Sequence, residues 1–246
     1  MPTALSTHRV SKTFRDANGE RIHALQDISV EIRAGEFFVF VGPSGCGKST
    51  LLRIMSGLEH EYDGEIRLDP DIRPRDVSFV FQQFALLPWL TVAENIEMGV
   101  LASVASVAER RSRVKGELER FGLDDFACAR PRELSGGMKQ RVGIARAFVC
   151  EPKIIFMDEP FSELDSFMAA ELRKEFLHLW KESGETVVMV THLIPEALEL
   201  ADRIAVMTPG PGRIEKIVTN VLPRPRAKRS PEFFRLEDEL YKLIKP

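Results

Sequence analysis

Several features that would assign other classes of protein are scarce in this chain. Its 246 residues include only three cysteines, Cys46, Cys128 and Cys150, in no framework spacing. This predicts free thiols in a reducing compartment, not a disulfide-stabilised secreted scaffold. The first residues lack the apolar centre of a signal peptide, and no apolar run approaches the ~18 residues of a membrane span. We therefore expect a partner to make any connection with a membrane.

The chain also lacks a strong excess of either charge. Its formal net charge is −3, which gives no reason to expect nucleic acid as the main partner. The exception is residues 213–246, with nine Lys and Arg against five Asp and Glu. The basic cluster Arg224, Arg226, Lys228 and Arg229 lies among prolines, so we expect an extended segment outside the core. Such a segment either remains solvated or touches an anionic membrane surface.

A glycine-rich loop directly follows the apolar run 37–41. The loop reads Gly42, Pro43, Ser44, Gly45, Cys46, Gly47, Lys48, Ser49, Thr50. Its glycines let successive N–H groups point inward, the following helix adds its positive end, and Lys48 adds a mobile charge. Ser49 supplies an oxygen ligand for a nucleotide-bound Mg²⁺. The loop predicts a polyphosphate site, because the preceding strand disfavours an ordinary strand-to-helix turn.

A second motif ends the apolar run 154–157 in two carboxylates, Asp158 and Glu159. A core strand has no packing reason to end this way. Asp158 is placed to hold a magnesium shell, and Glu159 to polarise a water for attack on a γ-phosphate. A strand end capped by solvated acids is the alternative, and the phosphate loop makes it the less favoured one.

The third motif, Ser135-Gly136-Gly137, precedes a helical pattern. Ser135 is typical of an N-cap, and the two glycines expose N–H groups at the start of the helix, which predicts a second anion site. One chain has no use for two γ-phosphate sites around one nucleotide, but two chains packed head to tail do. A helix cap without a ligand is the default interpretation of an isolated Ser-Gly-Gly.

The alternation of strands and helices predicts an α/β fold with a parallel core sheet. Strands are expected at 9–14, 22–32, 37–41, 65–68, 77–81, 153–157, 185–191, 203–207 and 213–221, and helices at 49–56, 92–100, 107–121, 138–149, 166–183 and 233–244. The early strands indicate an added antiparallel sheet, and residues 88–150 an inserted helical subdomain. We expect one nucleotide-binding domain over 1–222 and a short basic extension over 223–246.

The order of these motifs resembles the ATPase subunit of an ATP-binding cassette (ABC) transporter, from about Leu5 to Leu222. Six motifs carry the resemblance: 42–50 resembles Walker A, Gln82 the Q-loop, 134–138 the signature, 154–159 Walker B, 162–165 the D-loop, and His192 the switch histidine. The signature is specific to this superfamily among P-loop proteins. The resemblance implies a P-loop NTPase core that binds ATP and Mg²⁺.

The resemblance also implies a role for each residue. Glu159 is the expected general base, His192 contacts the γ-phosphate, and Gln82 reaches the metal and the attacking water. Phe14 stacks on adenine unless it belongs to the core. The remaining contacts are Lys48, Ser49 and Thr50 on phosphates and Mg²⁺, Asp158 on the metal, Ser135, Gly136 and Gly137 from the opposite subunit, and Asp165 from the D-loop.

Three positions depart from the family pattern. Phe14 replaces a frequent Tyr and keeps the π-face. Glu163 replaces a small D-loop residue and adds a carboxylate near the expected dimer interface. Leu193 stands where an acid usually follows the switch histidine, and Pro195 suits the first turn of the next helix.

The amino-acid sequences of residues 86–92 and 209–214 resemble those of the ATPase subunits of nitrate, sulfonate and taurine importers. The apolar stretch around Trp89 is a plausible docking surface. We expect a transmembrane permease, a second copy or a homologous ATPase subunit, and indirectly a solute-binding protein as partners. The expected location is the cytoplasmic face of the inner membrane. The alternatives are a soluble cassette protein acting on DNA or ribosomes, and a non-hydrolysing regulatory subunit, which Glu159 and His192 argue against.

Overall fold

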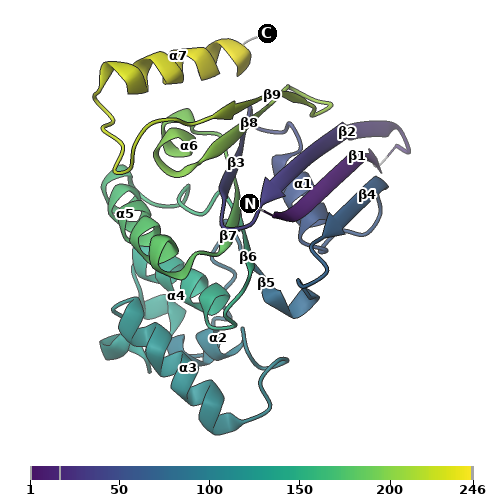
Figure 1. Cartoon of the computed structure of the whole chain (residues 1–246). Helices are drawn as coiled ribbons and strands as arrows, with labels where there is room; N and C mark the ends of the chain where they lie inside the picture. Colours follow the sequence, from purple (N-terminus) through teal and green to yellow (C-terminus); the bar gives the residue numbers. More distant parts are fainter. Residues whose placement is uncertain (1, 17, 245–246) are drawn as a thin grey trace. The chain divides into compact units, whose positions relative to one another are not determined.

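The chain divides into two compact units, Met1–Ile72 with Thr186–Pro246, and Arg73–Glu185. The structure is a computed structural model and describes residues 2–16 and 18–244 (Figure 1). Each unit contains strands and helices of its own, and each has its own buried core.

The first unit contains an antiparallel sheet in the order β2-β1-β4. Its strands are β1 (Thr3–Arg15), β2 (Arg21–Arg33) and β4 (Asp63–Leu68). Burial alternates in the second half of β2, with Ile28, Val30 and Ile32 inside, so one face of the sheet packs and the other is wet. The predicted antiparallel sheet is therefore present, with β1 seven residues longer than predicted and β2 and β4 two residues longer each.

The same unit contains the strands β3 (Phe37–Val41), β7 (Thr186–Thr191), β8 (Arg203–Met207) and β9 (Ile214–Thr219), in the order β7-β3-β8-β9. Strand β3 runs parallel to β7 and β8, and β9 is antiparallel to β8. All five residues of β3 are buried, as expected of a central parallel strand covered on both faces. Val41 pairs with Thr191, so β3 and β7 end level with each other.

The described residues of the first unit also form the helices α1 (Lys48–Met55), α6 (Ile194–Leu200) and α7 (Pro231–Ile244). Helix α1 buries Leu51 and Leu52, and Gly57, just after its C-cap Ser56, has φ 75°, a left-handed conformation that glycine adopts readily after a helix. Helix α7 buries Phe233 and Leu240 and lies beside α6 and β8 (Figure 1).

The second unit combines two parallel strands with four helices. The strands are β5 (Val77–Val80) and β6 (Ile154–Asp158), and the helices are α2 (Val92–Glu97), α3 (Val107–Arg120), α4 (Gly136–Phe148) and α5 (Ser166–Ser183). Short 3₁₀ turns occupy Pro74–Asp76, Asp124–Phe126 and Pro131–Glu133. The ring of Phe148 on α4 lies 5.9 Å from Phe121 and 6.0 Å from Phe176, which fixes α4 against its neighbours.

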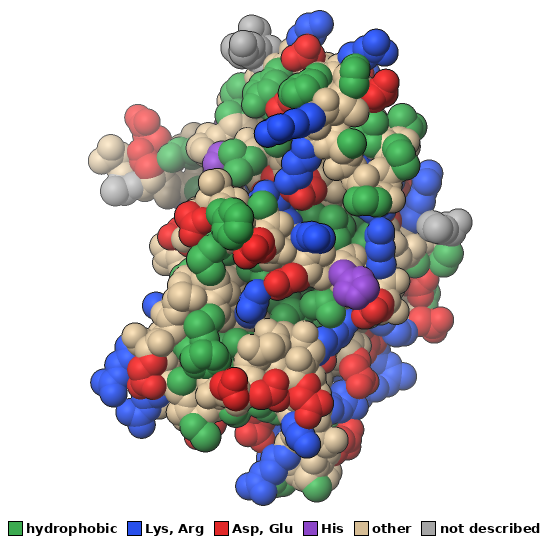
Figure 2. Space-filling model, turned by 90° about the vertical axis from the view of Figure 1, so that its left-hand side faces the viewer, with side chains coloured by type: hydrophobic (Ala, Val, Ile, Leu, Met, Phe, Trp, Pro, Cys, Tyr) green, Lys and Arg blue, Asp and Glu red, His purple; other side chains and the backbone are tan. Residues whose placement is uncertain are grey.

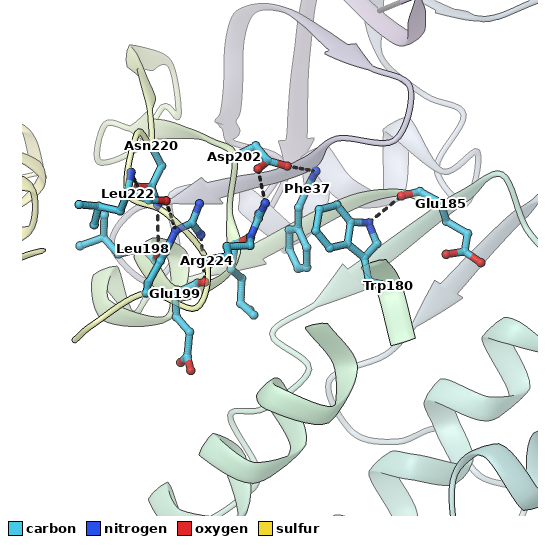
Figure 3. Close-up of polar contacts among 11 residues, drawn as sticks. Phe37, Trp180, Glu185, Leu198, Glu199, Asp202, Asn220, Leu222 and Arg224 are labelled. Atoms are coloured by element: carbon cyan, nitrogen blue, oxygen red, sulfur yellow. Dashed lines mark hydrogen bonds and ion pairs between the residues drawn. The ribbon is translucent and has the colours of Figure 1, made fainter. Parts of the chain in front are cut away.

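The helices of this unit do not form a separate helical subdomain. Helices α2, α3 and α4 lie within the range 88–150 of the predicted helical subdomain, but α4 also packs on β5 and α5. Trp180 ends the last buried turn of α5, and its indole N–H donates to the Glu185 carbonyl at 2.8 Å (Figure 3). The helical segment therefore shares a core with two strands and α5.

The basic cluster differs from the prediction of an extended segment outside the core. Arg226 is only 9% exposed, and Arg224 forms an ion pair with Asp202 (Figure 3). The prediction was wrong for these two arginines because their partners lie at the end of α6, more than twenty residues earlier in the chain. Lys228 and Arg229 are exposed.

The surface mixes both charges. Figure 2 shows one face on which acidic and basic side chains are interspersed, with small groups of hydrophobic side chains between them. Within residues 2–16 and 18–244, no helix has the length and apolarity that crossing a bilayer requires.

Candidate nucleotide and catalytic site

The predicted site residues divide between the two units. The first unit holds Phe14, the loop 42–50 and His192, and the second holds Gln82, Ser135, Gly136, Gly137, Asp158, Glu159 and Asp165. Apart from Phe14, which lies in the antiparallel strand β1, these residues lie at the carboxyl ends of parallel strands or at the start of a helix. Ligands of α/β proteins bind at such ends.

Two glycines of the loop are required by their surroundings. A Cβ on Gly47 would lie 2.7 Å from the Ala24 carbonyl oxygen, and Gly47 has φ +94°. A Cβ on Gly42 would lie 2.9 Å from the carbonyl oxygen of Met207. Only glycine fits at both positions, so the loop can turn tightly between β3 and α1.

Lys48 is 4% exposed and folds back over the loop. Its ammonium donates to the carbonyl oxygens of Gly42 and Pro43, at 2.9 Å each. The first helical hydrogen bond of α1 runs from Leu51 N–H to Gly47 O at 2.9 Å, so the N–H groups of residues 48–50 precede the helical ladder. The loop therefore combines a positive charge with amide donors, as an anion site requires.

His192 follows β7 at the same sheet edge as the loop, because Val41 and Thr191 are paired. Its side chain is exposed, whereas Thr191 is buried and its hydroxyl accepts the Leu193 N–H at 3.1 Å. The register thus brings the predicted switch histidine beside the end of β3, from which the phosphate loop emerges.

Phe14 lies near the end of β1 and is 39% exposed. The alternative that Phe14 is a core residue is therefore wrong. The ammonium of Lys12 lies 4.8 Å from the centroid of this ring. The same ammonium forms an ion pair with the Glu59 carboxylate at 3.2 Å. An exposed aromatic face beside a fixed cation suits a flat, electron-rich ring system.

In the second unit, the last residue of β5, Val80, pairs with Met157, so β5 ends one residue before β6. Gln82 therefore follows β5 at the edge where β6 ends in Asp158 and Glu159 follows it. Asp158 is 3% exposed, whereas Glu159 is half-buried. The pairing confirms the predicted acidic strand end and adds the amide of Gln82 to the same edge.

Glu159 has φ +43°, an uncommon conformation for a residue with a side chain. Its carbonyl oxygen accepts from the Ser162 hydroxyl at 2.9 Å and from the Ser162 N–H at 3.2 Å. Strained backbone of this kind persists only where neighbouring contacts hold it, and it occurs frequently at functional positions. The sequence alone gave no indication of this conformation.

Ser135 is the N-cap of α4, as predicted, and its hydroxyl accepts the Met138 N–H at 3.3 Å. The helix already begins at Gly136, two residues before its predicted start. A Cβ on Gly137 would lie 2.3 Å from the end of the Met168 side chain on α5. A side chain at position 137 would therefore displace the flexible end of Met168, and the N–H groups at this helix end are free of any side chain from Gly136 or Gly137.

Asp165 is the N-cap of α5, and one of its carboxylate oxygens accepts the N–H groups of Phe167 and Met168 at 3.0 Å each. The structure thus gives Asp165 a capping role. Its contact with a nucleotide remains a prediction. Glu163, the D-loop departure, is exposed.

The donor chemistry fits Mg²⁺. Ser49 offers a hydroxyl, Asp158 a carboxylate and Gln82 an amide oxygen, all of them hard oxygen ligands. Among residues 2–16 and 18–244, no cluster of three or more His, Cys, Asp and Glu forms a complete metal cage. Hard oxygen ligands of this kind, in each unit taken by itself, suit an ion that keeps waters and takes phosphate oxygens as ligands.

Sequence reasoning missed Arg146 on α4. Its guanidinium donates to the carbonyl oxygens of Phe84 at 3.0 Å and Ala85 at 2.6 Å. Phe84 and Ala85, two and three residues after Gln82, both have positive φ values, 55° and 46°. Burial lowers the pKa of Arg146. An arginine within the otherwise apolar stretch 142–150 was the available signal.

Comparisons with known proteins agree with this arrangement. Residues 25–162 match a family described as ABC transporter. The chain is 41% identical over 234 residues to an aliphatic sulfonates import ATP-binding protein, SsuB, of Bacillus cereus, covering 93% of this chain and 91% of that protein. It is 40% identical to an uncharacterized ABC transporter ATP-binding protein of Methanocaldococcus jannaschii, covering 100% of this chain and 92% of that one.

Among solved structures, a dimer of the ATP-binding cassette MJ0796 in a post-hydrolysis state, bound to ADP and Pi, is similar. The TM-score is 0.77 at 37% identity, covering 88% of this chain and 98% of that one. This similarity confirms the α/β fold class predicted from the sequence.

Proposed function

The chain belongs to the ABC transporter family and is an ATPase, and from this premise we propose that it energises an importer of a small organic or inorganic anion. The supporting observation is the combination of two features. One is the loop 42–50, with Lys48 folded over it, and the other is the strained Glu159 beside Gln82 at a strand end.

In this function each described residue has a chemical role. The amides of the loop and Lys48 bind the β- and γ-phosphates. Glu159 accepts a proton from the attacking water, and Gln82 orients that water. His192 contacts the γ-phosphate, and the face of Phe14 stacks on adenine. A bound Mg²⁺ would be held by Ser49, Asp158 and Gln82 and would neutralise charge on the phosphates.

A second copy, or a homologous subunit, would complete the site. Ser135, Gly136 and Gly137 would contact the γ-phosphate bound by the opposite subunit, with Asp165 of the D-loop nearby. The dimeric MJ0796 cassette supports this arrangement. Each nucleotide would then contact both chains, which links hydrolysis to subunit motion.

A membrane permease is the second partner. In the second unit, a cavity of about 320 Å³ is lined by Phe79, Phe81, Met98 and Arg146, among others, and Trp89 is 67% exposed. These apolar surfaces suit an inserted helix of a permease. Such docking would hold the chain at the cytoplasmic face of the inner membrane, and a solute-binding protein would deliver the solute.

The names of the relatives support a solute class. SsuB proteins of several Bacillus species are named for the import of aliphatic sulfonates. We therefore favour an aliphatic sulfonate, a class that includes taurine, with the inorganic anion nitrate as the other candidate.

The test of the ATPase assignment is Glu159→Gln in the purified chain, assayed with ATP and Mg²⁺. We expect turnover to fall at least about a hundredfold, because general-base catalysis supplies roughly 10²–10⁴ in rate. Glu171→Gln, an exposed carboxylate on α5, is the matched control and should keep wild-type turnover. Normal hydrolysis by Glu159→Gln would contradict the assignment of the base.

The transport assignment is tested separately, by purifying a tagged chain from membranes of the native organism and by measuring uptake. We expect a multi-span permease in the eluate. Deletion of the gene should abolish uptake of radiolabelled taurine, ethanesulfonate or nitrate, and Glu159→Gln should fail to restore it. Ribosomal or DNA-repair proteins in the eluate, with uptake of all three solutes intact, would contradict the transport function.

A further inference from the structure

The C-terminal end of helix α6 is capped by side chains from a distant segment. The helix ends without a left-handed glycine, since Ala201 follows at φ −76° and ψ 145°. Its last carbonyl groups therefore need other partners. Asn220 donates to Leu198 O at 2.9 Å and Arg226 to Glu199 O at 2.9 Å.

Arg224 completes this arrangement by donating to Leu200 O and pairing with Asp202 (Figure 3). Three successive carbonyls of α6 are thus bound by three side chains, Asn220, Arg224 and Arg226, which we name the C-terminal clamp.

The clamp is buried, and its positive charges lie at the negative end of the α6 dipole. Asn220 is 7% exposed and Arg226 9%. Burial lowers the pKa of Arg226 to about 10, with Arg224 adding to the effect, so Arg226 remains charged at neutral pH. Cations at the end of α6 face the negative end of the helix dipole. The side chain of Glu199 adds a contact to Lys228 at 2.8 Å.

The clamped helix starts beside His192 and ends at the opposite end of β3 from the phosphate loop. At its start, Ile194 follows His192 by two residues, and Thr191 holds the Leu193 N–H at 3.1 Å. At its end, one carboxylate oxygen of Asp202 accepts the Phe37 N–H at 3.0 Å, at the beginning of β3. Strand β3 leads directly into the phosphate loop.

We propose that the C-terminal clamp is a positioning element of ATP hydrolysis, which holds α6 and thereby sets the place of His192. Helix α6 is two turns long and spans only about 10 Å, so a shift at its end is transmitted to its start. Ala197, Leu198 and Leu200 are fully buried, which makes the helix move as a rigid body. This inference rests on the proposed function, because His192 must contact the γ-phosphate for its place to matter.

The first experiment measures ATP hydrolysis by the full chain with Arg226→Ala, using Mg²⁺ and ATP. We expect kcat to fall at least fivefold, with KM for ATP within twofold of wild type, because the phosphate loop keeps its own contacts. Arg226→Lys keeps a charged donor and should recover part of the rate. Arg229→Ala removes an exposed charge from the same segment and should behave as wild type. Rates are given per folded molecule, from nucleotide-binding stoichiometry.

The second experiment repeats Arg226→Ala in a His192→Ala background, under single-turnover conditions that resolve slow rates. If the clamp acts through His192, the added loss is less than twofold. An equal loss in both backgrounds would overturn the proposal, as would a wild-type kcat in Arg226→Ala. If Arg226→Ala does not fold, Arg226→Lys takes its place in the same comparison.

The outcome also separates the inference from the proposed function. A wild-type chain without ATP hydrolysis, or one indifferent to Glu159→Gln, would contradict the ATPase roles themselves. An active wild-type chain with an unaffected Arg226→Ala variant would contradict only the clamp.

Discussion

Gly47 owes its place in the phosphate loop to two separate constraints, and a matched glycine isolates one of them. Gly47 and Gly184 both have left-handed φ values, +94° and +75°. A Cβ on Gly47 would collide with the backbone of Ala24, whereas one on Gly184 would meet nothing within 4 Å. The difference between the two positions therefore reports the close approach of the loop to β2.

We expect Gly184→Ala to lower the free energy of unfolding by about 1–2 kcal/mol, the cost of a left-handed alanine, and to leave KM for ATP unchanged. Gly47→Ala should cost more and raise KM for ATP by about tenfold or more, since the loop must move. Urea unfolding and steady-state ATPase assays measure both effects. Equal behaviour of the two variants would contradict the steric explanation.

Glu117 on α3 gives stability a pH dependence. Burial raises the pKa of Glu117 to about 7, partly offset by Arg120 and reinforced by Glu185 and Glu151. One carboxylate oxygen is buried without a hydrogen bond. Between the unfolded pKa of 4.5 and the folded pKa of about 7, the folded state binds more protons. Glu117 therefore lowers the free energy of unfolding as the pH rises through this window.

The variant Glu117→Gln should therefore be more stable than wild type at pH 8, by about 1–2 kcal/mol after allowance for solvent screening. At pH 5 the two proteins should differ little. Glu119→Gln, an exposed neighbour on the same helix, should show no such difference. Urea unfolding at the two pH values decides the question, and a pH-independent difference would be contrary to this account.

At the scale of elements, helix α4 links two predicted parts of the site. It starts at the predicted anion site after Ser135, and near its other end Arg146 binds the segment after Gln82. Its Arg146 binds the carbonyls of Phe84 and Ala85, which have left-handed backbones. A comparable arginine, Arg110 on α3, binds the carbonyls of Val104 and Ala105 at 2.9 and 3.0 Å. Both arginines hold a loop, but only Arg146 holds the loop that contains a predicted site residue.

We expect Arg146→Ala to lower the free energy of unfolding by about 2–4 kcal/mol, because two hydrogen bonds from a charged donor are lost. Arg110→Ala should lose stability in a similar range. Only Arg146→Ala should also lose ATPase activity per folded molecule, because the segment after Gln82 is released. A loss of activity in both variants would indicate general loosening of the second unit.

The elements also show how far the sequence could predict the structure. Helix α5 and strand β8 have the predicted bounds 166–183 and 203–207, since both have local signals: an Asp cap and a terminal glycine, or a short apolar run. Helix α4 begins two residues early because Gly136 and Gly137 carry no periodic side chain. Strand β1 extends to Thr3 because it pairs with both β2 and β4, a contact that no local pattern contains.

The candidate site was predictable where a residue is marked by its neighbours in sequence. The loop 42–50 and the acids 158–159 are of this kind. The positive φ of Glu159, the loop contact of Arg146 and the burial of Arg226 depend on partners far along the chain. For the same reason, the expectation that the basic cluster lies outside the core failed.

For the whole molecule, we expect ATP to bring two copies together. Glu159→Gln with ATP should elute as a dimer in gel filtration, and with ADP as a monomer, because hydrolysis no longer opens the closed state. Adding Gly136→Asp places a negative charge at the start of α4, where a partner's phosphate would bind. The double variant should still bind ATP but remain monomeric, and a dimer from it would contradict the role of this helix end.

The C-terminal clamp has a consequence for proteolysis. Trypsin cuts after Lys and Arg but not before Pro, and Arg224 precedes Pro225. Arg226 is buried against α6, whereas Lys228 and Arg229 are exposed. Limited digestion of the folded protein should therefore cut after residue 228 or 229 and leave the clamp attached to the larger fragment. The bonds after Lys228 and Arg229 lie between the clamp and α7. A cut at either bond releases α7 and leaves Asn220, Arg224 and Arg226 bound to α6 in the remaining chain.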